Sequence, residues 1–146
     1  MKRGAWLLPI LLLAGCSSRE VVVVYSPHGM DVLGDYKRLF EAAHPGVELR
    51  CLDMGAQEIY AKVSAERGRP AADVWWGAPA TMFRQAAREG LLDGYRPSWA
   101  DAAAPGHRDP EDRWYATHLS PLAIMFNTRR YQKHELPQTW DDLLDP

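Results

Sequence analysis

Blocks of apolar residues alternate with chain breaks over residues 20–92. Glu20–Tyr25 is a run of β-branched residues, of the kind that forms a central parallel strand covered on both faces. Two further strands are predicted at Val47–Leu52 and Ala72–Trp76. Between and after them, apolar residues recur three or four positions apart, which predicts helices. The order β-α-β-α-β-α indicates an α/β fold built on a parallel sheet.

Three helices follow these strands. The first carries an apolar repeat and ends at His44-Pro45-Gly46, and the second spans Gln57–Arg67. The third begins at Pro79, a favoured first-turn residue, and Gly90 is expected to end it. The apolar positions are Val32, Leu33, Tyr36, Leu39, Phe40 and Ala43 in the first helix and Met82, Phe83, Ala86 and Ala87 in the third.

The pattern is less regular after Tyr95. We expect a loop with at most a short helix at Trp99–Ala104, then strands at Trp114–His118 and Leu122–Asn127. Thr139 and Asp142 form a capping signal at the start of a last helix.

The N-terminus has the features of a secretory signal. Met1-Lys2-Arg3 is basic, Ala5–Leu13 is apolar except for Pro9, and Leu13-Ala14-Gly15-Cys16 resembles the bacterial lipobox. We predict a signal peptide over 1–15, lipidation of Cys16 and a tether over 16–20. The alternatives are plain secretion and an uncleaved helix. The lipid would hold the protein in the cell envelope, in the periplasm or on the outer face of the cytoplasmic membrane.

Composition excludes several classes. With 47% hydrophobic residues, 25% charged residues and a net charge of -2, the chain is globular and carries no basic footprint for nucleic acid. Once Cys16 is lipidated, Cys51 has no disulfide partner, and we expect it to be a buried strand residue. The sequence lacks the glycine fingerprint and the Walker loop of nucleotide sites, as well as the G-x-S-x-G and H-E-x-x-H motifs. We therefore predict no enzyme activity and no cofactor.

Ligands of parallel sheets bind outside the carboxyl ends of the strands, where the three breaks lie. Helix N-termini there attract anions through unpaired N–H groups and a partial positive charge. Ordinary turn chemistry is the alternative. One of Trp75 and Trp76 is expected in the core, and Trp76 is favoured for the cleft. The predicted ligand-binding residues are Ser26, His28, Gly29, Gly55, Gln57, Trp76 and Gly77.

Several motifs, in this order, resemble a bacterial extracellular solute-binding protein, closest to the ferric-iron-binding branch that feeds ABC importers. After the lipobox they are Val24-Tyr25-Ser26-Pro27-His28-Gly29, the stretch from Phe40 to Glu48, Ala72-Asp73-Val74-Trp75-Trp76-Gly77, Glu89-Gly90-Leu91-Leu92 and the stretch from Leu136 to Pro146. The resemblance implies two α/β lobes of the type II periplasmic-binding-protein fold, with the ligand trapped between them.

Members of that family run to more than twice this length. The resemblance therefore implies a first lobe over 21–120 and, over 121–146, the crossover and the start of an incomplete second lobe. It also implies a monomeric, lipid-anchored protein that captures a small anionic or metal-chelate solute and delivers it to ABC permease subunits.

Ferric iron is an alternative ligand. The family's iron-binding members use a histidine and an acidic residue from the first lobe. His28 lies near the histidine position, but Trp76-Gly77-Ala78-Pro79 offers no carboxylate. Fe³⁺ favours anionic oxygen ligands, so the missing carboxylate argues against direct iron binding. His28 would be a metal ligand only if iron is the transported solute. The alternatives to the solute-binding lipoprotein are thus a ferric-iron-binding protein and a truncated envelope lipoprotein without transport activity.

Overall fold

A computed structural model describes residues 19–144, so the predicted signal peptide and Cys16 lie outside the described residues. Three parallel strands form one sheet: β1 (Glu20–Ser26), β2 (Val47–Asp53) and β3 (Val74–Trp75). Their order is β2-β1-β3, with β1 in the centre. The predicted α/β class, the parallel sheet and its three strands are confirmed.

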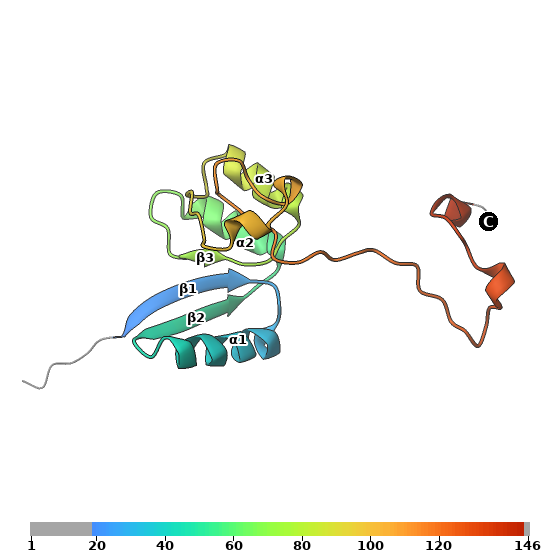
Figure 1. Ribbon diagram of the computed structural model, residues 1–146, viewed down its shortest axis with the longest axis horizontal. Helices are drawn as coiled ribbons and strands as arrows, with labels where there is room; N and C mark the ends of the chain where they lie inside the picture. Colours follow the sequence, from blue (N-terminus) through green and yellow to red (C-terminus); the bar gives the residue numbers. More distant parts are fainter. Residues whose placement is uncertain (1–18, 145–146) are drawn as a thin grey trace, which may run out of the picture. The chain divides into compact units, whose positions relative to one another are not determined.

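Helices cover the sheet on both sides (Figure 1). They are α1 (Met30–Ala43), α2 (Ala56–Ala65) and α3 (Ala80–Arg88). The connection from β1 to β2 runs toward one edge of the sheet, and the connection from β2 to β3 runs back toward the other edge. Crossovers between parallel strands are right-handed, so the helices in these two connections, α1 and α2, lie on opposite faces of the sheet. Figure 1 shows α1 along β2, with α2 and α3 on the side of β3.

Strand alternation divides the side chains between these two faces. Tyr25 is 2% exposed and points to the side of α2, where its hydroxyl donates to both carboxylate oxygens of Glu66 at 3.2 Å. Lys62 pairs with Glu66 at 2.6 Å and lowers the pKa of that carboxyl. This network ties the central strand to the C-terminal end of α2.

On the other face, α1 packs on β2 through Leu33, which is 1% exposed, and caps the outer edge of the sheet. Lys37 Nζ donates to the Leu49 carbonyl at 2.6 Å, and the Leu49 N–H donates to Glu41 at 2.9 Å. Lys37 and Glu41 form an ion pair at 3.2 Å. Backbone groups that an edge strand would leave open are thereby satisfied by side chains of α1.

Gly90 ends α3, as the sequence predicts. Its φ of +67° is a left-handed conformation that glycine adopts without strain. The Gly90 N–H donates to the Ala87 carbonyl, and the Leu91 N–H donates to that of Ala86, both at 3.0 Å. This bonding pattern is the Schellman motif, which satisfies the last carbonyls of the helix.

The chain divides into two compact units, one ending at Tyr115 and the other starting at Ala116. In the first, the loop after Tyr95 contains short 3-10 helices at Ala100–Ala102 and Pro105–His107. The predicted strand Trp114–His118 is wrong. The region forms one isolated bridge between Arg108 and Tyr115, because no neighbouring strand extends the pairing.

In the second unit, the predicted strand Leu122–Asn127 is also wrong, since these residues have no strand partner and Leu122 and Met125 are almost fully exposed. Short 3-10 helices occupy Lys133–Glu135 and Asp141–Leu144. The predicted capping signal is present: Thr139 N–H donates to Asp142 at 2.8 Å, and Asp142 N–H donates to the Thr139 hydroxyl at 3.4 Å. Across residues 19–144, no helix has the length and apolarity needed to cross a membrane.

Candidate functional site

Three chain breaks meet at the edge where the strands end. Because β1, β2 and β3 are parallel, residues 26–29, 53–55 and 76–79 leave the sheet on the same side. Backbone hydrogen bonds join them: Met54 N–H donates to the Ser26 carbonyl at 3.2 Å, and Trp76 N–H donates to that of Tyr25 at 2.9 Å. The sheet thus brings together three corners that are far apart in the sequence.

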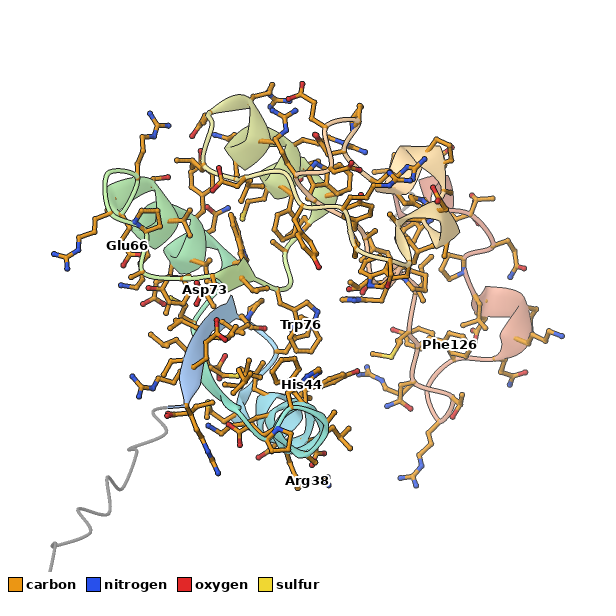
Figure 2. All side chains as sticks on the ribbon, turned by 60° about the vertical axis from the view of Figure 1, so that its left-hand side comes forward. Arg38, His44, Glu66, Asp73, Trp76 and Phe126 are labelled. Atoms are coloured by element: carbon orange, nitrogen blue, oxygen red, sulfur yellow. The ribbon has the colours of Figure 1, made fainter. Side chains whose placement is uncertain are left out.

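The first and third corners are packed into an aromatic cluster. The His28 imidazole stacks on the Trp76 indole, with ring centroids 4.4 Å apart and planes inclined by 26°. His28 Nδ1 lies 2.7 Å from the Ser26 hydroxyl, within hydrogen-bond distance. Tyr36 of α1 meets the Trp76 ring edge-on at 4.8 Å. Figure 2 shows Trp76 at the strand end on the side of α1, and Glu66 away from it on α2.

Gly77 allows the His28 ring to lie where it does. Its φ is +97°, and a Cβ added there would lie 2.2 Å from Cε1 of His28. Glycine is therefore needed at this position for two reasons: its backbone conformation and the close approach of the His28 ring. Gly29, with a φ of +79°, begins α1.

All three helices begin at this edge without a side-chain cap. The N-cap residues are Gly29, Gly55 and Pro79, which carry no side-chain acceptor. In α1 and α2 the first-turn N–H groups therefore remain as donors, whereas in α3 the Met82 N–H donates to the Pro79 carbonyl at 2.9 Å. The helix dipoles make the edge attractive to an anion. Asp31 in α1 and Glu58 in α2 add negative charge to the first turns, whereas α3 has no first-turn acid.

The predicted site residues divide into two groups. Ser26, Trp76 and Gly77 each contact or closely approach His28, and Gly29 follows it as the N-cap of α1. Gly55 and Gln57 open α2 next to them, and Gln57 is exposed there. Tyr36 was missed as part of the cluster. Helical spacing put it on the apolar stripe of α1, and only the sheet shows that Trp76 meets that stripe.

The two adjacent tryptophans point to opposite faces, as alternation along a strand requires. Trp75 packs against Phe83 of α3 at 4.8 Å and Tyr60 of α2 at 6.4 Å, while Trp76 joins His28 and Tyr36. The sequence analysis favours Trp76 for the cleft and therefore Trp75 for the core. The structure places Trp75 between the sheet and the helices.

A groove of about 710 Å³ runs beside β3 on the face of α2 and α3, and none of the predicted site residues lines it. Its charged lining groups, except Asp93, bind other parts of the chain. Asp73 accepts the Val23 N–H at 2.8 Å, and Arg113 donates to Asp109 at 2.9 Å. A single carboxylate that is unpaired among the described residues does not make the set of convergent free polar groups that marks a solute site.

Within residues 19–144, no three His, Cys, Asp or Glu side chains gather in a group that could hold a metal ion. Cys51 is half-buried in β2, and desolvation raises the pKa of its thiol. A neutral thiol is a poor metal ligand and nucleophile.

Comparison with known proteins gives a family. Residues 70–146 match the family model described as bacterial extracellular solute-binding protein. A probable ABC transporter periplasmic-binding protein of Sinorhizobium fredii, y4fP, is 30% identical over 124 residues, which are 85% of this chain and 34% of the relative. The chain therefore spans about a third of that relative's length.

Solved structures agree on the fold. The periplasmic binding protein AfuA from Actinobacillus pleuropneumoniae, with exogenous fructose-6-phosphate bound, is 30% identical. The alignment covers 64% of this chain and 29% of that one, with a TM-score of 0.57. Iron-bound HitA from Pseudomonas aeruginosa gives a TM-score of 0.73 at 19% identity, over 87% of this chain and 41% of that one. At that identity, HitA is informative about the fold alone.

Proposed function

Because the chain belongs to the bacterial extracellular solute-binding proteins, a family that serves ABC transporters, we propose that it contributes one side of a binding site for a small anionic solute. The site is the strand-end edge around His28 and Trp76. The function is capture and delivery, with no chemistry performed on the solute.

The observation that carries this proposal is the convergence of three uncapped helix N-termini beside a stacked histidine. Each N-terminus supplies N–H donors and about half a positive charge. Pro79 N cannot donate, so the third corner contributes less. AfuA, whose structure holds fructose-6-phosphate, supports a phosphate ester as the class of anion, since a phosphate matches helix N-termini and a sugar ring matches an aromatic face.

The same family supports a location and a partner. We propose a periplasmic protein, tethered to a membrane by a lipid on Cys16, that hands its solute to ABC permease subunits. Hinge closure of two lobes would trap the solute, with residues 21–120 in the first lobe and residues 121–146 forming the crossover and the start of the second.

An NMR titration of the full chain tests the anion site, because it detects millimolar affinities. Inorganic phosphate, fructose 6-phosphate and uncharged fructose are added separately while the His28 and Trp76 ring signals are followed. We expect both phosphate-bearing probes to shift these signals and uncharged fructose to leave them unchanged. Shifts of equal size with uncharged fructose would refute an anion site.

Two histidine variants locate the site. His28→Ala is expected to weaken the binding of fructose 6-phosphate by roughly ten- to a hundredfold, the loss typical of one charge-assisted hydrogen bond. His107→Ala changes an exposed histidine at the end of a 3-10 helix and should leave affinity unchanged. Equal affinities for the wild type and His28→Ala would remove His28 from the site.

A further inference from the structure

Three of the groups around the His28 ring come from two strand ends. The Ser26 hydroxyl lies at Nδ1, the Trp76 indole lies against one ring face, and the Gly77 backbone lies where a side chain would strike the ring. We propose that Ser26, Trp76 and Gly77 are positioning residues. They hold the His28 imidazole in one orientation and assign the proton of its neutral form to Nε2. The effect of this three-residue clamp on solute binding rests on the proposed function, whereas the clamp itself does not.

Ser26 sets the tautomer. The residue is fully buried, with 0% of its surface exposed, and a buried hydroxyl needs an acceptor for its hydrogen. Among the described residues, the bonding partner of this hydroxyl is His28 Nδ1, at 2.7 Å. When Ser26 donates, Nδ1 is the acceptor. A neutral imidazole then carries its single proton on Nε2 and acts through that atom as a donor.

Trp76 sets the plane of the ring. Stacking at 4.4 Å and 26° restricts the imidazole to a position nearly parallel to the indole. The indole is in turn held by Tyr36, which approaches it edge-on from α1 at 4.8 Å. The first helix therefore supports the orientation of His28 indirectly, through Trp76.

Gly77 keeps the space open. An added Cβ would lie 2.2 Å from Cε1 and 2.7 Å from Nδ1 of His28, distances that no real contact allows. The clashing atoms belong to the end of a side chain, so the ring would move rather than the backbone. An alanine at this position is thus expected to displace His28 from both the Ser26 bond and the Trp76 stack.

The chain offers a matched control for this substitution. Gly90 also has a positive φ, +67°, but a Cβ there meets nothing within 4 Å. Gly77→Ala and Gly90→Ala therefore share the backbone strain of a left-handed alanine, and only Gly77→Ala adds the clash with His28. Ser26→Ala removes the hydroxyl without changing the backbone, and Ser26→Thr restores it.

The test is NMR of the full chain labelled with ¹⁵N-histidine, with the His28 signals assigned by their loss in His28→Ala. In the wild type we expect the ¹⁵N pattern of a proton on Nε2 and ring-proton signals shifted upfield by the Trp76 ring. Gly77→Ala should abolish the upfield shift, and Gly90→Ala should preserve it. Ser26→Ala should mix the two tautomers, and Ser26→Thr should restore one.

A wild-type mixture of tautomers, or the same ring shift in Gly77→Ala as in Gly90→Ala, would overturn the clamp. Should Gly77→Ala fail to fold, the Ser26 pair decides the question alone. Titration with inorganic phosphate separates the two proposals: Gly77→Ala should bind about tenfold more weakly than Gly90→Ala. A fixed Nε2–H tautomer without any phosphate binding would support the clamp and refute the anion site.

Discussion

Two leucines of α1 provide a stringent test of which helix face carries the fold. Leu33 is 1% exposed and Leu39 is 60% exposed, although both belong to the same apolar repeat. Leu33→Ala removes a fully buried side chain and leaves a cavity, which costs about 3–5 kcal/mol of unfolding free energy. Leu39→Ala removes a side chain that has lost less than half of its surface to burial. Its cost is about 1 kcal/mol or less, because alanine also favours the helix slightly.

Urea denaturation followed by tryptophan fluorescence and by circular dichroism measures both costs. With a slope of about 1.5 kcal/mol/M, a loss of 3 kcal/mol lowers the midpoint by about 2 M, whereas Leu39→Ala should lower it by well under 1 M. Both variants replace leucine by alanine in the same helix, so the difference between their midpoints reports the difference in burial. Equal midpoints would show that the exposed stripe of α1 is covered in the folded protein and would refute the packing described here.

Three further predictions concern single ionisable or modified groups. The hydrogen bond from the Leu49 N–H lowers the pKa of the Glu41 carboxyl below its ordinary value of 4.5. This bond therefore stabilises the fold fully above pH 4.5, and the stabilisation is lost as the pH falls through the lowered pKa. Denaturation at a series of pH values should accordingly show a weaker acid dependence in Glu41→Gln, and an unchanged dependence would contradict this role. Burial raises the pKa of Cys51, so iodoacetamide should alkylate it more slowly in the folded chain than in urea, and equal rates would exclude protection. Cys16→Ser should abolish incorporation of labelled fatty acid, and persistent labelling would disprove the predicted anchor.

Short-range patterns determined most of the fold. The β-branched run Glu20–Tyr25, the helical repeats and the breaks between them correspond to β1, α1 and the elements that follow as far as α3. Gly90 was identified as a helix end because only glycine readily adopts the left-handed conformation that its position requires. These features depend on neighbours within one or two helical turns and are therefore visible in the sequence.

The two wrong strands show the limit of such patterns. The apolar runs Trp114–His118 and Leu122–Asn127 resemble strands, but a strand is stabilised by hydrogen bonds to a neighbour that its own sequence does not contain. β3 is shorter than the predicted strand Ala72–Trp76 and consists of Val74–Trp75. The flanking Asp73 and Trp76 N–H groups still donate to the carbonyls of Val23 and Tyr25 in β1.

The sequence by itself determined that three chain breaks with glycine, serine and histidine fall at strand ends, and that parallel strands would bring those ends to one edge. Only the tertiary structure decided what they form there. The register of β1 and β3 places Ser26 and Trp76 on the face of α1 and Trp75 on the opposite face. It also brings Gly77 beneath the His28 ring. Residues about fifty positions apart meet because side chains alternate along paired strands, a relation that exists only once the strands are paired.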